Sequence, residues 1–246
     1  MKLNCDMGES FGHWQLGMDD AVMPHIDMAN IACGFHASDP LIMQQTVALA
    51  KQYDVAVGAH PGYPDLVGFG RRHMQCTTDE IQALILYQIG ALAAFCQQQD
   101  ISLSYVKPHG ALYNDMMQDE AILVAILKGI AAFSANLPLM LMAQADNNHN
   151  ESLAAQFEVP LLFEAFADRR YTDSGALQDR RQAGAVFTQQ SQVMNQAIQI
   201  AEQGFVTSNT GKLIQLNADT LCVHGDNAQS IAAIAQIKSA ITDKKG

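Results

Sequence analysis

Residues 104–114, Ser-Tyr-Val-Lys-Pro-His-Gly-Ala-Leu-Tyr-Asn, join a short apolar run to a loop that carries a lysine and a histidine. Proline and glycine mark the turn, so ionisable side chains are held out where the backbone changes direction. Five further segments share this character: residues 4–9 (Asn-Cys-Asp-Met-Gly-Glu), 30–36 (Asn-Ile-Ala-Cys-Gly-Phe-His), 58–65 (Gly-Ala-His-Pro-Gly-Tyr-Pro-Asp), 164–169 (Glu-Ala-Phe-Ala-Asp-Arg) and 223–226 (Val-His-Gly-Asp). The pattern is typical of an enzyme that builds one site from loops scattered along its sequence.

Short apolar runs of strand length alternate with longer helical stretches. Strands are predicted at 55–57, 104–106, 139–142, 161–163 and 220–223, and helices near 40–53, 78–99, 118–133, 189–203 and 227–241. Such alternation favours a parallel sheet, closed or open. Five of the six segments follow a predicted strand or precede a helix, which places them at the carboxyl edge of that sheet. No linker or repeat divides the chain, so residues 1–246 are predicted to form a single α/β domain.

The composition narrows the class of protein. Fourteen Lys and Arg oppose 25 Asp and Glu, and a net charge of −11 makes nucleic acid or an anionic membrane surface an unexpected partner. Five cysteines without a Cys-x-x-Cys pair suggest a reducing compartment, here the cytoplasm. A carboxylate at Asp6 precedes any apolar run, so no signal peptide is expected. The apolar run 81–96 is shorter than the roughly 20 residues of a membrane span and predicts a buried helix.

The ionisable residues of the six segments favour hydrolytic chemistry. Carboxylates and imidazoles can exchange protons near neutral pH, and Lys107 and Arg169 could bind a carboxylate or stabilise an oxyanion. A dinucleotide fingerprint and a Gly-x-Ser-x-Gly elbow are both missing from the sequence. The histidines in the segments are His36, His60, His109 and His224, whereas His13, His25, His73 and His149 are interpreted as ordinary surface or core residues. Asp39 and Asp226 each precede a helical run, so N-capping explains either one equally well.

Longer strings of residues indicate a family. They are residues 4–9, 29–40, 58–61 with 68–72, 87–92, 106–114 and 166–171, in order and without large insertions between residue 2 and about residue 230. On these strings the chain resembles the LamB/YcsF family. Met7 and Ser38 stand where Leu and Gly are expected, and neither departure removes a charged group.

The resemblance implies a fold, a reaction and a set of site residues. The fold is a distorted, seven-stranded (β/α) barrel of the glycoside hydrolase/deacetylase type. The reaction is that of an ATP-dependent 5-oxoprolinase, which opens the cyclic amide of 5-oxo-L-proline to L-glutamate and in which this chain works with ATP and with partner subunits B and C. The catalytic residues would be Asp6, Glu9, His36, His60, Lys107 and His109. The substrate-binding residues would be Asn4, Asn30, Asp65, Arg71, Glu164, Asp168, Arg169, His224 and Asp226.

Two other functions fit the same residues. One is a metal-dependent hydrolase, because related deacetylase barrels bind a divalent ion through one Asp and two His, and Asp6 with two of His36, His60 and His109 could reproduce that set. The other is a binding protein without chemistry of its own, with the catalytic groups on its partner subunits.

The sequence also yields predictions about geometry. The six segments should converge on one cleft at the carboxyl ends of the strands. Asp6 and Glu9, three residues apart, should raise each other's pKa if both are buried, so that one stays protonated as an acid while the other acts as a base. Lys107 ends a strand and precedes a proline, so its ammonium should project into the cleft and attract an anionic group of the substrate. A lysine paired with a neighbouring carboxylate for stability alone is the alternative.

Overall fold

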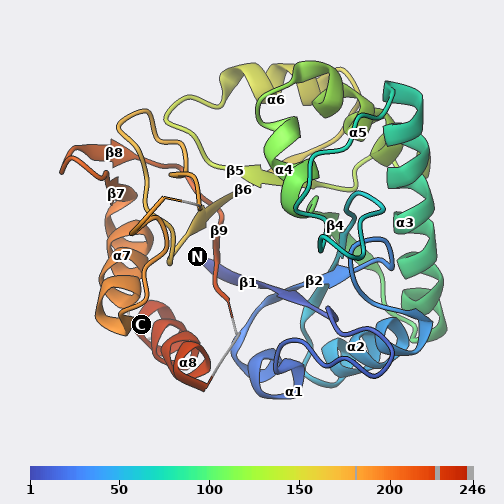
Figure 1. The fold of residues 1–246 in the computed structure, drawn as a ribbon, viewed down its shortest axis with the longest axis horizontal. Helices are drawn as coiled ribbons and strands as arrows, with labels where there is room; N and C mark the ends of the chain where they lie inside the picture. Colours follow the sequence, from blue (N-terminus) through green and yellow to red (C-terminus); the bar gives the residue numbers. More distant parts are fainter. Residues whose placement is uncertain (181, 225–227, 243–246) are drawn as a thin grey trace.

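The computed structural model describes residues 1–180, 182–224 and 228–242 and shows a closed barrel of seven parallel strands (Figure 1). The strands, in order around the barrel, are β1 (Lys2–Met7), β2 (Met28–Ala32), β3 (Ala56–His60), β4 (Leu103–Val106), β5 (Leu139–Met142), β6 (Leu161–Phe166) and β9 (Thr220–Cys222). The seven-stranded α/β barrel implied by the family resemblance is confirmed.

Helices surround the barrel (Figure 1). They are α1 (Asp19–Val22), the 3-10 helix η1 (Met23–His25), α2 (Pro40–Gln52), α3 (Thr78–Gln98), α4 (Gly110–Met116), α5 (Glu120–Phe133), α6 (Asn148–Ala155), α7 (Gln190–Gln203) and α8 (Ala228–Thr242). A hairpin of β7 (Phe205–Thr207) and β8 (Leu213–Gln215) lies outside the barrel. The five predicted helices and five predicted strands all exist, but the predicted ranges did not include β1, β2, α1, η1, α4, α6 or the hairpin.

Local signals fix where the long helices begin. The Asp39 carboxylate accepts hydrogen bonds from the backbone N–H groups of Leu41 and Ile42, so the N-cap interpretation of Asp39 is confirmed. Thr77 and Glu80 form the predicted capping box at the start of α3. By length and composition α3 could cross a membrane. Ile81, Ile85, Ile89 and Leu92 are nevertheless buried along one face, which packs against α5 and the barrel.

The barrel interior is filled in layers because successive side chains of a strand point to opposite faces. A small apolar cluster fills one level of the interior: Met28, Tyr105 and Met140, with Ala56 and Leu162 packed against it. Gly58 makes room for this cluster, since a Cβ at that position would lie 2.2 Å from the Tyr105 ring. A separate, larger core lies between the outer face of the barrel and the helices.

The pairing of strands is uneven around the barrel. Parallel registers of three to five residue pairs join most neighbours, for example Met28↔Ala56 through Ala32↔His60 between β2 and β3. Between β4 and β5 the register consists of one pair, Val106↔Leu139. This β4–β5 seam is the least extensively paired junction in the barrel.

Candidate active site

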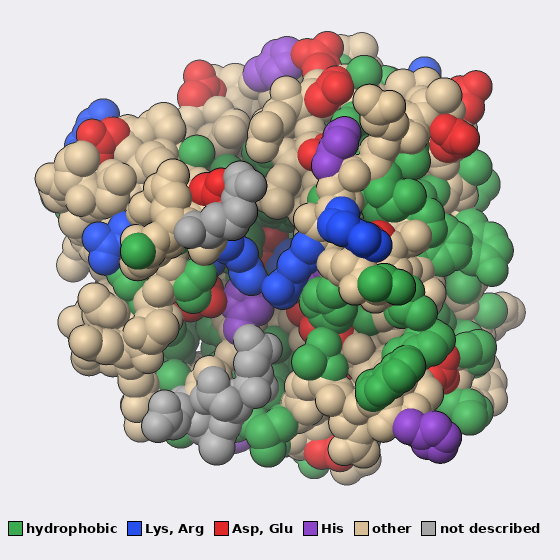
Figure 2. All heavy atoms as spheres, in the orientation of Figure 1, with side chains coloured by type: hydrophobic (Ala, Val, Ile, Leu, Met, Phe, Trp, Pro, Cys, Tyr) green, Lys and Arg blue, Asp and Glu red, His purple; other side chains and the backbone are tan. Residues whose placement is uncertain are grey.

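The candidate site lies at the carboxyl ends of the barrel strands, as predicted. Histidine, acidic and basic side chains gather around a hollow near the centre of this face (Figure 2). Contacts of 4 Å or less connect the predicted catalytic residues Asp6, Glu9, His36, His60, Lys107 and His109 in one cluster. Segments that are up to about a hundred residues apart in the sequence thus lie together, because all strands of a parallel barrel have their carboxyl ends at the same end of the barrel.

A layer of buried polar side chains crosses the barrel beneath this cluster. The Asn4 amide donates to Glu164 Oε2 (3.3 Å) and to Thr220 Oγ1 (3.0 Å). The Asn30 amide donates to Asn4 Oδ1 (2.8 Å), and the Tyr105 hydroxyl donates to Asn30 Oδ1 (2.7 Å). Three predicted substrate-binding residues, Asn4, Asn30 and Glu164, therefore form a fully buried support for the site rather than a surface in contact with solvent.

Lys107 is held by this network and by Asp6. Its Nζ lies 3.0 Å from Glu164 Oε2 and 3.2 Å from Asp6 Oδ1, and it donates to Asn4 Oδ1 at 3.1 Å. Burial lowers the pKa of a lysine, but the charges of Asp6 and Glu164 outweigh burial and raise the pKa of Lys107 well above its usual value. The prediction that this ammonium projects into the cleft is wrong, because Lys107 is buried and acceptors within the protein surround its Nζ.

Asp6 lies at the boundary between the buried layer and the hollow. Its side chain is 17% exposed, its Oδ1 accepts from Asn30 Nδ2 (2.8 Å), and its Oδ2 lies 3.4 Å from His60 Nε2. Burial raises the pKa of a carboxyl, but His60 and Lys107 outweigh burial and hold the pKa of Asp6 well below its usual range. The prediction that Asp6 and Glu9 raise each other's pKa is therefore wrong for Asp6, because Lys107 and His60, which come from distant strands, lie beside it and lower its pKa.

His60 and His109 face each other with fixed ring orientations. His60 Nδ1 lies 2.6 Å from the Lys107 carbonyl and His109 Nε2 lies 2.9 Å from the Phe69 carbonyl, so each of these nitrogens must donate a proton. The other two nitrogens, His60 Nε2 and His109 Nδ1, lie 2.9 Å apart. When both rings are neutral, each of these nitrogens carries a lone pair, and the two lone pairs repel each other. A proton shared between them, or a cation bound to both, makes this contact favourable.

His36 and Glu9 complete a possible ligand cluster above this pair. Nitrogen and oxygen atoms of Glu9, His36, His60 and His109 all lie within 4.8 Å of one another, so the cluster could bind a metal ion. His36 is fully buried, and neither of its ring nitrogens has a hydrogen-bond partner within the described chain. Burial, with His109 and His60, lowers the pKa of His36 well below its usual value, and burial lowers the pKa of His109 to about 3. Neutral imidazoles of this kind are suitable metal ligands.

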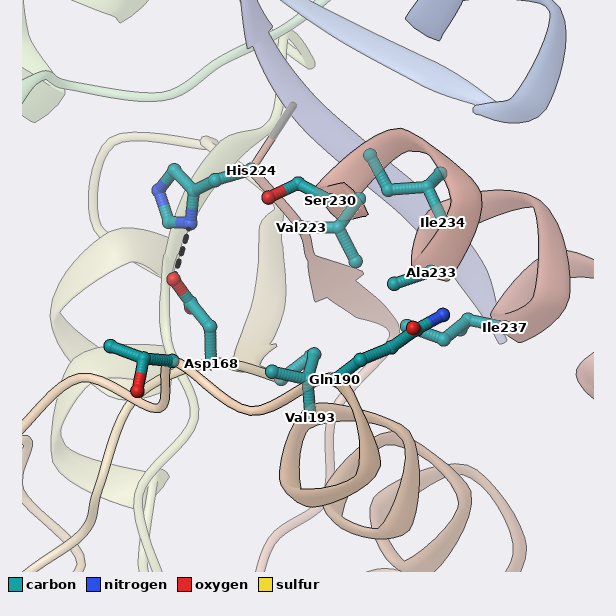
Figure 3. Close-up of a pocket in the computed structure, with 11 residues that line it drawn as sticks. Asp168, Gln190, Val193, Val223, His224, Ser230, Ala233, Ile234 and Ile237 are labelled. Atoms are coloured by element: carbon teal, nitrogen blue, oxygen red, sulfur yellow. Dashed lines mark hydrogen bonds and ion pairs between the residues drawn. The ribbon is translucent and has the colours of Figure 1, made fainter. Parts of the chain in front are cut away.

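Asp168 and His224 form a second ionic pair at the same rim. His224 Nδ1 lies 2.9 Å from Asp168 Oδ2, as the dashed contact in Figure 3 shows. The pair closes one end of a pocket whose apolar wall includes Val193 of α7 and Ile234 and Ile237 of α8 (Figure 3). The negative charge of Asp168 raises the pKa of His224 even though burial opposes it. Burial raises the pKa of Asp168, but His224 outweighs it and the pKa of Asp168 is lowered.

Asp65 stabilises the loop after β3 through contacts within that loop. It is buried and pairs with Arg72, whose Nε donates to Oδ1 at 2.9 Å, while the Gly68 backbone N–H donates to the same oxygen at 2.9 Å. These contacts hold the loop after β3. Arg71, its neighbour in sequence, is exposed and lies over the Phe69 ring.

Arg169 is buried and only partly satisfied. Its Nη2 donates to the Gln178 carbonyl (2.8 Å), whereas its Nε has no partner in the ranges that the structure describes. Burial and the nearby Arg180 lower the pKa of Arg169. Asp226, the last predicted substrate-binding residue, lies outside the described residues.

Two glycines give the histidines their space. A Cβ at Gly62 would lie 2.7 Å from His36 Nδ1, and a Cβ at Gly70 would lie 2.7 Å from His36 Cβ and 2.9 Å from His109 Cδ2. Gly70 also has a left-handed backbone, with φ of +62°. These glycines thus shape the histidine cluster as well as the turns to which they belong.

Sequence reasoning missed Cys222, Tyr105 and Thr220, which line the barrel interior with the predicted residues. Cys222 Sγ lies 3.4 Å from Lys107 Nζ. A signal was present for each of them. Tyr105 precedes Lys107 by two positions, Cys222 precedes His224 by two positions, and Thr220 pairs with Glu164 across the sheet. A period of two along a strand marks residues on one face.

A sequence model of the LamB/YcsF family matches residues 1–246. The chain belongs to the LamB/YcsF family. Two relatives in this family share more than half of their residues with it. A Vibrio vulnificus protein named as the A subunit of 5-oxoprolinase is 58% identical over 239 residues, which cover 97% of this chain and 96% of the relative. A Pseudomonas putida protein, which bears the same name followed by the numeral two, is 56% identical over 239 residues, which cover 97% of this chain and 93% of the relative.

A solved structure of similar fold is known. The lactam utilization protein from Thermus thermophilus superposes with a TM-score of 0.91 at 39% sequence identity, covering 100% of this chain and 97% of that chain. That protein, with 39% of its residues identical to those of this chain, thus has the same barrel fold.

Proposed function

We propose that this chain is one subunit of an ATP-dependent 5-oxoprolinase, which hydrolyses 5-oxo-L-proline to L-glutamate while ATP is hydrolysed to ADP and phosphate. The observation that carries the proposal is the identity of 58% and 56%, over nearly the whole chain, to proteins named as the A subunit of 5-oxoprolinase. The similar solved structure bears the name of a lactam utilization protein. A five-membered lactam resists hydrolysis, so coupling to ATP makes its opening favourable.

The site offers groups for the addition of water to the lactam carbonyl. The Asp6 carboxylate stays ionised beside Lys107 and is partly open to the hollow, so it can hold a water molecule. A carboxylate of such low pKa is a weak proton acceptor. We therefore assign proton uptake to Asp6 and His60 together, since Asp6 Oδ2 lies 3.4 Å from His60 Nε2. In this mechanism Lys107 keeps Asp6 charged and does not itself bind the substrate.

Arg169 is the side chain that we assign to the substrate carboxylate. Its guanidinium is buried, is close enough to Arg180 for that charge to lower its pKa, and has an Nε without a partner among the described residues. A bound carboxylate would supply the missing acceptor and offset the repulsion between two guanidinium groups.

The proposal includes ATP as a co-substrate and partner subunits B and C. It also places the protein in the cytoplasm, a location supported by five cysteines that are all free thiols. The relatives named as the A subunit of 5-oxoprolinase support an assembly, because the name describes one part of a larger enzyme.

A metal-dependent hydrolase is the second candidate, and the unpartnered His36 favours it. The ligands would be Glu9, His36, His60 and His109, so the structure points to Glu9 rather than to Asp6 as the carboxylate ligand. A divalent cation there would polarise the carbonyl and lower the pKa of a bound water. Metal analysis of the purified chain, followed by activity measurements after chelation, separates this candidate from the metal-free reaction.

Reconstitution tests the main proposal. The chain is purified and assayed alone and with subunits B and C for glutamate and phosphate release from 5-oxo-L-proline and ATP. We expect turnover that requires this chain, and a loss of at least about a hundredfold for Asp6→Asn, with Asp20→Asn, at an exposed position, as the control. An assembled complex that releases no glutamate contradicts the proposal, and a fully active Asp6→Asn complex shows that Asp6 is not required for catalysis.

A further inference from the structure

We propose that His224 is the general acid that delivers a proton to the ring nitrogen as the lactam C–N bond breaks, and that Asp168 is its positioning residue. The inference rests on the proposed function and adds to it a second catalytic group, on the other side of Asp6 from His60. It is carried by the strand register around β9 and by the contact between His224 and Asp168.

The register of the strands places the three residues side by side. Asn4 of β1 and Phe166 of β6 both pair with Cys222 of β9. Two positions further along these strands come Asp6, Asp168 and His224. The pairing continues past the end of β9, because the Val223 N–H donates to the Asn4 carbonyl (3.0 Å) and the Ala167 N–H donates to the Cys222 carbonyl (3.2 Å).

The period of two along each strand also sets the direction of these side chains. Asn4 and Cys222 both reach Lys107 in the barrel interior. Asp6 and His224, two residues on, therefore belong to the same inner face of their strands. His224 consequently lies at the rim between Asp6 on β1 and Asp168 beyond β6.

The Asp168 contact orients the imidazole of His224. With Nδ1 held 2.9 Å from Asp168 Oδ2, the Nε2 edge of the ring is directed away from Asp168 (Figure 3). The His224 side chain is 21% exposed, so a substrate in the hollow can reach it. The charges that act on the ring are those of Asp168 and Asp6, which favour the imidazolium, and that of Arg180, which opposes it. The balance raises the pKa of His224, so the imidazolium is available near neutral pH.

Ring opening needs a proton donor at this place. After water has added to the carbonyl carbon and lost a proton on the Asp6 side, the C–N bond breaks and its electron pair moves to nitrogen. An amide anion is a very poor leaving group, so His224 Nε2–H transfers its proton to nitrogen as the bond breaks. The carbon becomes the new carboxyl group, the nitrogen becomes the amine of glutamate, and neutral His224 recovers a proton from solvent. Two groups with different environments thus divide the acid and base tasks.

The test uses the reconstituted complex with 5-oxo-L-proline and ATP. His224→Asn keeps an N–H that can donate to Asp168 but removes the acid, and we expect kcat to fall by about 10² to 10⁴ with little change in KM. For the wild type, kcat should decline at alkaline pH as His224 loses its proton. Asp168→Asn removes the charge that raises the pKa of His224, so the alkaline decline should move to lower pH.

The outcomes separate this inference from the proposed function. An inactive wild-type complex overturns both. An active wild type with an equally active His224→Asn variant overturns the acid role alone. If His224→Asn does not fold, Asp168→Asn still decides: an unchanged alkaline decline of kcat contradicts the inference, because a merely structural aspartate would alter stability without moving that pH dependence.

Discussion

Burial determines the role of Lys107. Because its ammonium pairs with Asp6 (3.2 Å) and Glu164 (3.0 Å) inside the barrel, Lys107→Met leaves two carboxylates without their cation. We expect the free energy of unfolding to fall by about 3–5 kcal/mol and turnover to be lost as well. Urea denaturation followed by circular dichroism measures the first effect.

The matched controls for Lys107→Met are a surface lysine and a double variant. Lys128→Met, at an exposed position, should leave stability nearly unchanged. Lys107→Met combined with Glu164→Gln should be more stable than Lys107→Met alone, because one uncompensated charge is removed. A Lys107→Met protein that unfolds at the wild-type urea concentration would show that the buried pairs contribute little.

The sequence predicted which side chains meet, but not what each one does there. Loops after parallel strands share one edge, so the convergence of Asp6, His60 and His109 followed from their positions in the chain. The pairing of Lys107 with Glu164 did not, because it depends on which side chains point inward across the barrel. Asp65 likewise looked like a binding residue until the structure showed its contacts with Arg72 and Gly68.

The loop after β3 fixes the histidine cluster through Gly70. Alanine at this position would combine a left-handed backbone with a Cβ 2.7 Å from His36 Cβ and 2.9 Å from His109 Cδ2. We expect a loss of about 1–3 kcal/mol in stability and at least a tenfold loss of turnover in the reconstituted enzyme. Gly184→Ala is the control, since Gly184 also has a positive φ but its Cβ would meet no atom within 4 Å. Equal losses of activity for the two variants would contradict a role for Gly70 in placing the rings.

The same loop makes the stability of the protein depend on pH in the acidic range. Hydrogen bonds from Arg72 lower the pKa of Asp65 to about 2. A carboxyl with a lowered pKa in the folded state stabilises the protein above its unfolded pKa of about 4, and this contribution is lost as the pH falls toward 2. The wild type should therefore have a higher Tm than Asp65→Asn at neutral pH, and the difference should shrink between about pH 4 and pH 2.

Neighbouring arginines provide the control for this pH effect. Arg72→Ala should resemble Asp65→Asn, whereas Arg71→Ala should behave as the wild type because Arg71 lies over Phe69 instead. A Tm difference that does not vary with pH would indicate that Asp65 contributes through packing alone.

Secondary structure followed from the sequence where a local signal was strong. The capping residues Asp39 and Thr77 fixed the starts of α2 and α3 to within one residue. β2 was not predicted, because Met28–Ala32 is a short strand whose middle residue is the polar Asn30, which interrupts the apolar run. The β7–β8 hairpin and α4 were also missed, since each is short and depends on contacts with the rest of the fold.

The closed barrel accounts for nearly every strand of the chain, and we propose that residues 1–246 fold as one domain. The family resemblance supplied the number of strands. The alternation of strands and helices alone left an open sheet as an equal alternative, because closure depends on pairing between β9 and β1, at opposite ends of the sequence.

The strands β4 and β5 should separate more easily than other neighbouring strands of the barrel. With one residue pair holding these strands, local separation there costs less free energy than at β2–β3, where five pairs must break together. In D₂O, the Val106 amide, which donates to the Pro138 carbonyl across the seam, should exchange its hydrogen faster than the amides of Asn30 and Ile31 in β2. Equal protection at both places would contradict this. Lys107 and His109 follow β4 in the sequence. Transient separation of β4 from β5 would therefore widen the carboxyl end of the barrel beside these two residues. A bound molecule could leave the site through that opening.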